Sequence, residues 1–175
     1  MSEVTLRAAQ SADIPALSQL ATDAFIAKFG HLYSAEDLAA FLDQVLSQQG
    51  IAGDYADPDQ IYRLAEVDGT MIGFCKIGLK PCCPEYARGK RAMELKQLYT
   101  AAGATGQGIG AQLMDWAMAE LAARGADEVQ LSVYSENFGA HRFYERYGFS
   151  KVADITFTVG SHVDPEFLFA KLLSA

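Results

Sequence analysis

The sequence predicts one α/β (α+β) domain whose elements follow the order β α α β β β α β α β β. Segments with apolar residues three or four positions apart alternate with segments of period two, which favours mixed helix and strand. The chain has 175 residues, 50% of them apolar, so it can bury a large core without a disulfide or a metal ion. We therefore expect a single domain over residues 1–175.

The amino-terminal quarter is expected to hold one strand and two helices. Val4 to Arg7 has the composition of a short strand, and the helical spacing that follows ends near Gly30. Ser34 with Asp37 three residues later resembles a capping box. The second helix is therefore predicted to begin there and to stop before Gly50.

A β-hairpin is expected next. Ile61 to Val67 and Thr70 to Leu79 are rich in strand-forming residues, and Asp68-Gly69 between them tolerates the positive φ of a two-residue turn. After a polar loop, Ala92 to Thr100 alternates in the manner of a third strand.

The remaining elements are two helices and three strands. Helical spacing covers Gly110 to Arg124 and Asn137 to Tyr147, with a strand at Glu128 to Tyr134 between them. Phe149 to Val159 and Phe167 to Leu172 are predicted to form a closing antiparallel pair.

Charge and cysteine content limit the function classes. With 14 Lys plus Arg against 22 Asp plus Glu the net charge is −8, which argues against nucleic acid and anionic membranes as partners and favours a small cationic substrate. The chain has an odd number of cysteines, Cys75, Cys82 and Cys83, so we expect them to be reduced thiols in the cytoplasm. The first twelve residues lack the basic end and apolar run of a secretory signal.

A glycine-rich loop, Gly106-Gln107-Gly108-Ile109-Gly110, lies between a predicted strand and a predicted helix. Free backbone N–H groups at the positive end of a helix dipole favour an anion there. A flexible connection and a dinucleotide fingerprint remain alternatives, the latter weakened by the long gap before the first glycine. A P-loop is excluded because Ile109-Gly110 replaces the required Lys-Ser or Lys-Thr.

Three segments of the sequence form a recognisable set: Glu94 to Thr100, Gly106 to Gly110, and Asn137 to Phe149. Together they resemble the GCN5-related N-acetyltransferase (GNAT) superfamily. The resemblance implies a mixed, mostly antiparallel central sheet flanked by helices. Within the superfamily, the last strands and the segment Ser34 to Leu42 resemble PaiA-type spermidine/spermine acetyltransferases.

The resemblance also implies acetyl-CoA as the acetyl donor and assigns its contacts. The diphosphate would bind the loop amides, the pantetheine arm would pair with β-strand backbone, and two residues of the following helix would add cofactor contacts. These positions are Gly106, Gln107, Gly108, Ile109, Gly110 and Ala111, then Leu98, Tyr99 and Thr100, then Asn137 and Arg146. The first loop position, often Arg or Gln in the family, is Thr105 here, so basic groups must come from elsewhere, with Arg142 a further candidate.

Two residues match the family's catalytic positions. Tyr144 matches the general acid that protonates the leaving thiolate, and Glu94 matches the base that deprotonates the amine. We expect Glu94 to share a strand face with Leu98. Each of these residues also has an ordinary structural explanation. Tyr144 would be an aromatic residue that packs its helix on the sheet, Glu94 an exposed acid on a strand, and Asn137 a helix cap.

The sequence thus predicts an acetyl-CoA-dependent N-acetyltransferase acting on a primary amine by direct transfer, with a polyamine-like acceptor favoured. Peptide or protein amines, aminoglycosides, and a non-catalytic acyl-CoA-binding module are the alternatives. No His, Cys or acidic residues stand at metal-ligand spacing, so no metal is expected, and a thiol mechanism is disfavoured. A homodimer is common in the family.

Overall fold

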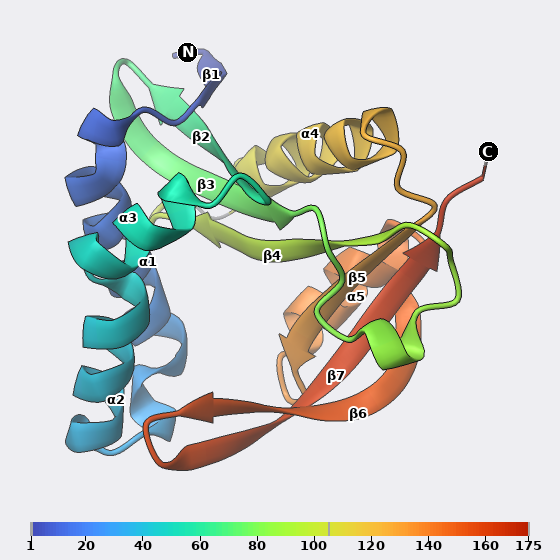
Figure 1. Cartoon of the computed structure of the whole chain (residues 1–175). Helices are drawn as coiled ribbons and strands as arrows, with labels where there is room; N and C mark the ends of the chain where they lie inside the picture. The colour runs from blue at the N-terminus through green and yellow to red at the C-terminus, as the bar shows by residue number, and fades with distance from the viewer. Residues whose placement is uncertain (1, 105, 175) are drawn as a thin grey trace.

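Seven strands form one sheet in the computed structural model, in the order β1-β2-β3-β4-β5-β7-β6, with helices against both faces (Figure 1). The structure describes residues 2–104 and 106–174. The strands are β1 (Val4–Ala8), β2 (Gln60–Val67), β3 (Thr70–Gly78), β4 (Ala92–Thr100), β5 (Glu128–Tyr134), β6 (Ser150–Val159) and β7 (His162–Leu172). The α-helices are α1 (Ile14–Phe29), α2 (Ala35–Phe41), α3 (Gln48–Ala56), α4 (Ile109–Ala123) and α5 (Phe138–Arg146).

The sheet is mixed and mostly antiparallel, which confirms the predicted fold class. Among the described strands, β4 and β5 form the one parallel pair, and every other neighbouring pair is antiparallel. Parallel neighbours need a crossover, and α4 supplies it on one face.

The parallel pair is short, and this creates the site. β4 and β5 share a register only at Ala92–Glu94 against Glu128–Gln130. β5 pairs with β7 along its whole length on its other edge, and β4 continues along β3 as far as Thr100. The facing edges of β4 and β5 therefore separate at the centre of the sheet.

Two apolar cores lie on opposite faces of the sheet. One is built around α4 and includes Leu113, Met114 and Val129, and the other packs α1 to α3 on β2 and β3 through Leu17 and Phe74. Side chains on each strand alternate between the two cores, as a two-sided sheet requires. Within the described residues, none of the helices has the length and apolar content to cross a membrane.

The β2–β3 hairpin is confirmed at the predicted turn. Asp68 has φ of 50° and Gly69 has φ of 77°, the left-handed values that a two-residue hairpin turn needs. The Asp-Gly pair therefore sets the register in which Val67 faces Thr70.

The predicted second helix differs from the structure. α2 ends at Phe41, a π-helical segment covers Leu42–Leu46, and a third helix, α3, starts after Ser47, whose Oγ accepts a hydrogen bond from Gly50 N at 3.1 Å. The second helix stops before Gly50, as predicted, but α3, which contains Gly50, was not predicted. A Cβ at this position would lie 2.7 Å from two backbone carbonyl oxygens, so glycine here permits a close backbone approach.

The last strand begins five residues earlier than Phe167, the predicted start. β7 starts at His162 and contains Pro165, which the strand pattern did not suggest. The carbonyl of Pro165 accepts a hydrogen bond from Ser135 N at 3.1 Å, just past the end of β5. The missing N–H of Pro165 therefore faces a position where no ladder bond is required.

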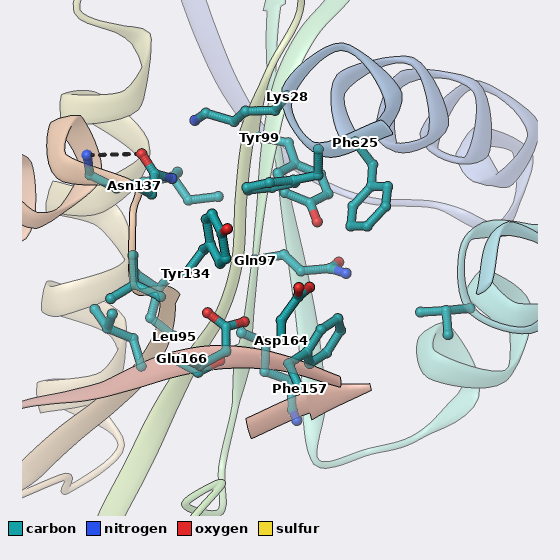
Figure 2. A pocket seen from close by; sticks show the side chains of 18 of the residues that line it. Phe25, Lys28, Leu95, Gln97, Tyr99, Tyr134, Asn137, Phe157, Asp164 and Glu166 are labelled. Carbon is teal, nitrogen blue, oxygen red and sulfur yellow. Dashed lines mark hydrogen bonds between the residues drawn. The ribbon is translucent and has the colours of Figure 1, made fainter. Parts of the chain in front are cut away.

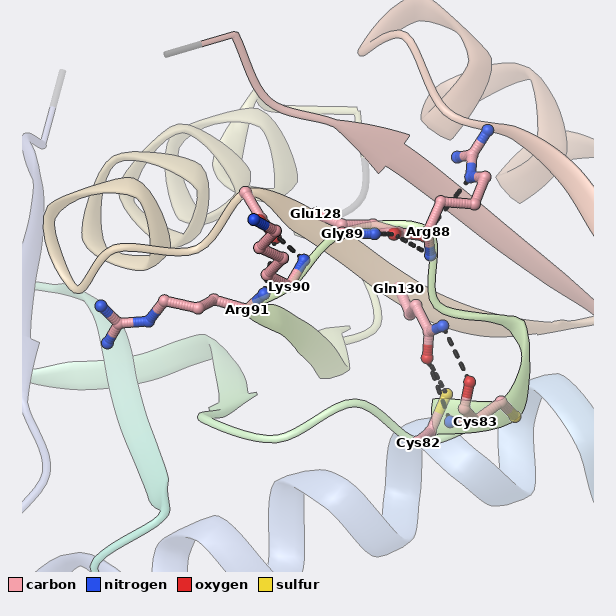
Figure 3. A network of polar contacts seen from close by, with 9 residues as sticks. Cys82, Cys83, Arg88, Gly89, Lys90, Arg91, Glu128 and Gln130 are labelled. Atoms are coloured by element: carbon pink, nitrogen blue, oxygen red, sulfur yellow. Dashed lines mark hydrogen bonds and ion pairs between the residues drawn. The ribbon is translucent and has the colours of Figure 1, made fainter.

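The loop between β3 and β4 is anchored on buried polar side chains of β5 (Figure 3). Glu128 Oε2 accepts hydrogen bonds from Arg88 N and Gly89 N at 2.7 and 2.6 Å, and the Gln130 amide bonds to both backbone groups of Cys83 at 3.0 Å. These polar groups are buried because they satisfy loop backbone. They have a structural role where β4 and β5 remain paired.

Candidate active site

A cavity opens where β4 and β5 separate, with α1, α2, α5 and the β6–β7 hairpin around it (Figure 2). One wall is the separated part of β4, and the opposite wall is β5 from Leu131 to Tyr134. The lining is Phe25, Lys28, Phe29, Tyr33, Phe41, Val45, Leu95, Lys96, Gln97, Leu98, Tyr99, Leu131, Ser132, Val133, Tyr134, Asn137, Ala140, Tyr144, Phe157, Asp164 and Glu166. The cavity holds about 220 Å³, which suits a small or slender ligand.

The predicted strand contacts lie on this wall. Leu98 and Tyr99 line the cavity, and Leu98, Tyr99 and Thr100 pair with β3 along one edge only. Their other edge faces the separated β5, where the ladder with β4 has ended at Glu94. Main-chain groups on such an edge are available to an extended ligand.

The glycine loop is shaped to present backbone amides. Gly106 and Gly108 have φ of 84° and 78°, and Gly108 is the N-cap of α4. The first intrahelical bond runs from Gln112 N to Gly108 O, so the amides of Ile109, Gly110 and Ala111 have no acceptor within the helix.

Space beside the loop is open. A Cβ built on Gly106, Gly108 or Gly110 would meet no atom within 4 Å, and Gln107 turns back to donate to Gly103 O at 2.9 Å. The loop thus has free donors and room for an anion. Thr105, expected at the first loop position, lies outside the described residues.

A hydrogen bond from the residue after α5 holds this helix beside the glycine loop. Tyr147 Oη donates to Ala111 O in the first turn of α4 at 3.2 Å, which brings the neighbouring Arg146 to the same end of α4. Arg146 is exposed, and its guanidinium lies 5.9 Å from the ring centre of Phe143. Asn137 caps α5 by accepting from Ala140 N at 3.3 Å and also lines the cavity.

Tyr144 lines the cavity from α5. Its ring packs on Phe143 and Phe149 at centroid distances of 5.3 and 6.1 Å, so it also holds the helix on the sheet. Burial raises the pKa of Tyr144 to about 12. The phenol therefore carries its proton at neutral pH.

Glu94 lies on the opposite face of β4 from Leu98, so the expectation that they share a face is wrong. The register between β3 and β4 shifts by one residue, with Leu95 facing Ile77 but Gln97 facing Lys76. This β-bulge reverses the alternation that follows it.

Glu94 is 7% exposed and does not line the cavity. Its carboxylate pairs with Lys96 Nζ at 2.9 Å, and Lys96 does line the cavity. The role of Glu94 as a base stays a prediction, with contact to the cavity only through this lysine.

Two carboxylates that sequence reasoning missed, Asp164 and Glu166, face the cavity from β7 (Figure 2). Asp164 is 3% exposed and accepts hydrogen bonds from the Tyr33 hydroxyl and, at 2.9 Å, from His162 Nε2. Glu166 is 9% exposed, and no described residue donates a hydrogen bond to its Oε2. The sequence did contain a signal for them, because two acids stand two residues apart on either side of Pro165, as on one face of a strand. The signal was missed because the last strand was predicted to begin only at Phe167.

The first helix contributes residues that the sequence did not single out. Phe25, Lys28 and Phe29 of α1 line the cavity, and Lys28 extends toward it from the side opposite β7 (Figure 2). Their apolar spacing is that of any core-facing helix, so periodicity alone could not distinguish them.

Within the described residues, no group of three His, Cys, Asp or Glu side chains is arranged to hold a metal ion. Cys75 is fully buried beside α4, and burial raises the pKa of its thiol to about 12. Such a thiol stays protonated and unreactive at neutral pH.

Known proteins share this arrangement. The profile of the acetyltransferase (GNAT) family matches residues 14–149. An uncharacterized N-acetyltransferase of Mycobacterium bovis is 32% identical over 139 residues, covering 79% of this chain and 83% of the relative. An aminoalkylphosphonate N-acetyltransferase of Salmonella typhimurium is 31% identical over 110 residues, covering 63% of this chain and 70% of the relative.

A solved structure agrees over the whole fold. The PaiA N-acetyltransferase of Thermoplasma acidophilum in complex with coenzyme A superposes with a TM-score of 0.79 at 20% identity, covering 98% of this chain and 99% of that one. The family profile spans α1, the separated strands β4 and β5, the glycine loop and α5, while the β6–β7 hairpin lies beyond the last matched residue. The chain therefore belongs to the acetyltransferase (GNAT) family.

Proposed function

We propose that this chain transfers the acetyl group of acetyl-CoA directly to the primary amine of a small cationic molecule, with a polyamine-like acceptor favoured. Membership of the family makes the chain an acetyl-CoA-dependent N-acetyltransferase. The acceptor and the roles of individual residues are the proposed part.

Donor binding is assigned to the loop and the free edge of β4. The open amides at the start of α4 would receive the diphosphate, with Arg146 adding positive charge. The pantetheine arm would run along Leu98 to Thr100, and its thioester would enter the cavity beside Asn137 and Tyr144.

The acceptor class depends on one observation, the two buried carboxylates of β7 at the cavity wall. A cation entering there meets negative charge in a poorly hydrated site, where electrostatic attraction is strong. The net charge of −8 favours the approach of such a cation, and the resemblance to PaiA-type enzymes is consistent with it.

The reaction requires a neutral amine close to the thioester carbonyl. The nitrogen forms a bond to the carbonyl carbon, the C–S bond breaks, and the departing thiolate takes a proton from the Tyr144 hydroxyl to give free CoA. Two carboxylates compete for the role of base on the amine, Glu94 from the sequence pattern and Glu166 from the cavity.

A second acceptor class is favoured by Lys28. This cation lines the same cavity as the two carboxylates, and an acceptor carrying both an amine and an anionic group would meet both signs of charge. The aminoalkylphosphonate N-acetyltransferase among the relatives acts on molecules of that kind by its name. Lys28→Ala would lower activity toward such an acceptor and spare a polyamine.

The test is a thiol-release assay with acetyl-CoA across five acceptors: spermidine, spermine, an aminoalkylphosphonate, a lysine peptide and an aminoglycoside. We expect the highest kcat/KM with spermidine or spermine. Preference for a peptide or an aminoglycoside would overturn the proposed acceptor class. Binding of acetyl-CoA without thiol release from any acceptor would support a non-catalytic acyl-CoA module instead.

A further inference from the structure

Glu166 is a buried carboxylate without a described hydrogen-bond donor. It lies on β7 opposite Tyr134, is 9% exposed, and lines the cavity. Its Oε2 is fully enclosed, and no described residue donates to it. A buried polar atom without a partner destabilises the fold, so its presence calls for an explanation.

The neighbouring groups do not neutralise it. Asp164, two residues away on the same strand face, adds a second negative charge. Lys28 and Lys96 line the cavity, but neither forms an ion pair with Glu166, and Lys96 pairs with Glu94. The other titratable groups that face this part of the cavity are Tyr33, Tyr99, Tyr134, Tyr144 and, through Asp164, His162. Burial, with the charge of Asp164 second, raises the pKa of Glu166 from its ordinary 4.5 to about 7.

Asp164 differs from Glu166 because its oxygens are already used. Its Oδ2 accepts from Tyr33 and its Oδ1 from His162 at 2.9 Å, so both oxygens of this buried carboxylate are satisfied. Of the two β7 carboxylates, Glu166 is the one with bonding capacity left for a ligand. Glu94 is bound to Lys96 and stands outside the cavity lining.

We propose that Glu166 contacts the acceptor nitrogen, holds it as an ammonium ion and takes its proton before attack. The inference rests on the proposed function, in which the acceptor is an amine. It makes Glu166 a catalytic residue contributed by β7, outside the three segments that carry the family resemblance.

The proton balance is complete within the named groups. The ammonium N–H bond breaks and its proton passes to the Glu166 carboxylate, leaving a neutral amine whose lone pair attacks the thioester carbon. The C–S bond breaks, and Tyr144 supplies a proton to the thiolate. The second nitrogen proton then leaves as the amide forms and restores the Tyr144 hydroxyl through solvent, while Glu166 releases its proton to water.

The decisive experiment is the pH dependence of kcat/KM for spermidine in the wild type and in Glu166→Gln. In the wild type we expect a rise below pH 7 and a level region up to the pKa of the amine, about 10.4 for an alkylammonium. In the variant only free amine reacts, so kcat/KM should be at least tenfold lower at pH 7.5 and rise with unit slope through that whole region. If Glu166 had a purely structural role, Glu166→Gln would lower kcat/KM at every pH without changing the shape of the pH profile.

Two matched variants complete the design. Glu3→Gln, an exposed acid before β1, should reproduce the wild-type profile. Glu94→Gln should keep the level region whatever its effect on the rate. Loss of the level region in Glu94→Gln, or its persistence in Glu166→Gln, would overturn the assignment of Glu166.

Failure of the proposed function gives a different result, since the wild type would then release no thiol with any amine.

A measurement on the unaltered protein covers the case in which Glu166→Gln does not fold. With CoA bound at pH 6.5, calorimetric titration of spermidine in buffers of different ionisation enthalpy should show a net release of protons from Glu166. Absence of proton release would contradict the contact.

Discussion

The phenol of Tyr33 donates a hydrogen bond to the carboxylate of Asp164, a residue 131 positions later in the chain. This bond joins the segment after α1 to β7 at the wall of the cavity, which both residues line. A second connection lies nearby, where Asp37 Oδ1 accepts from Ser161 N and Oγ at 2.7 and 2.8 Å. The β6–β7 hairpin is thereby held against α1 and α2, and the acceptor side of the cavity depends on that docking.

The first prediction concerns the leaving group. Tyr144→Phe removes the phenolic proton but keeps the ring contacts with Phe143 and Phe149. We expect kcat to fall by at least about tenfold, while the KM for acetyl-CoA stays within about threefold and the melting temperature is nearly unchanged. Steady-state kinetics with Tyr55→Phe, an exposed tyrosine, as control would check this. Unchanged kcat would remove Tyr144 from the mechanism.

The second prediction concerns the anion site. Gly108→Ala places a Cβ on a residue with φ of 78°, at a strain of about 1 kcal/mol, and beside the amides proposed to bind diphosphate. We expect the Kd for CoA measured by calorimetry to rise at least about fivefold. Gly53→Ala, in α3 with open space around it, should leave the Kd unchanged and raise helix stability. Equal Kd values in both variants would place the diphosphate elsewhere.

The third prediction concerns the charge beside Glu166. Because the negative charge of Asp164 raises the pKa of Glu166, Asp164→Asn should lower that pKa. The acidic limb of the kcat/KM profile for spermidine should then move below pH 7. The Asn side chain can still accept from Tyr33, which limits structural damage. If the acidic limb of the Asp164→Asn profile stays at the wild-type pH, a group other than Glu166 controls that limb.

The fourth prediction links Glu166 to stability. Its pKa in the folded protein, about 7, lies above the ordinary 4.5, so its contribution to stability is fully present below pH 4.5 and is lost as the pH rises to about 7. Glu166→Gln should therefore be more stable than the wild type above pH 7, by up to about 3 kcal/mol. Denaturant unfolding at pH 4.5 and pH 8 measures the difference. An equal difference at both values would contradict the buried ionisation.

The local order of the chain was largely predictable. Apolar periodicity, the Asp68-Gly69 turn and the Gly106 to Gly110 loop are short-range signals, and each depends on residues that are neighbours in sequence. The helix around Gly50 and the start of the strand around Pro165 were missed at this level. A glycine inside a helix can mark a close backbone approach, and a proline is tolerated in a strand where no ladder bond is needed.

The sequence by itself determined the order of the elements, the anion loop and the family resemblance, because each depends on the types and spacing of nearby residues. Only the tertiary structure decided which face of β4 carries Glu94, because a β-bulge depends on the pairing with β3. Only the tertiary structure brought Asp164 and Glu166 to the same cavity as Tyr33 and Lys28, residues more than 130 positions earlier in the chain. Side chains so distant in sequence meet through sheet order and helix packing, which no local pattern encodes.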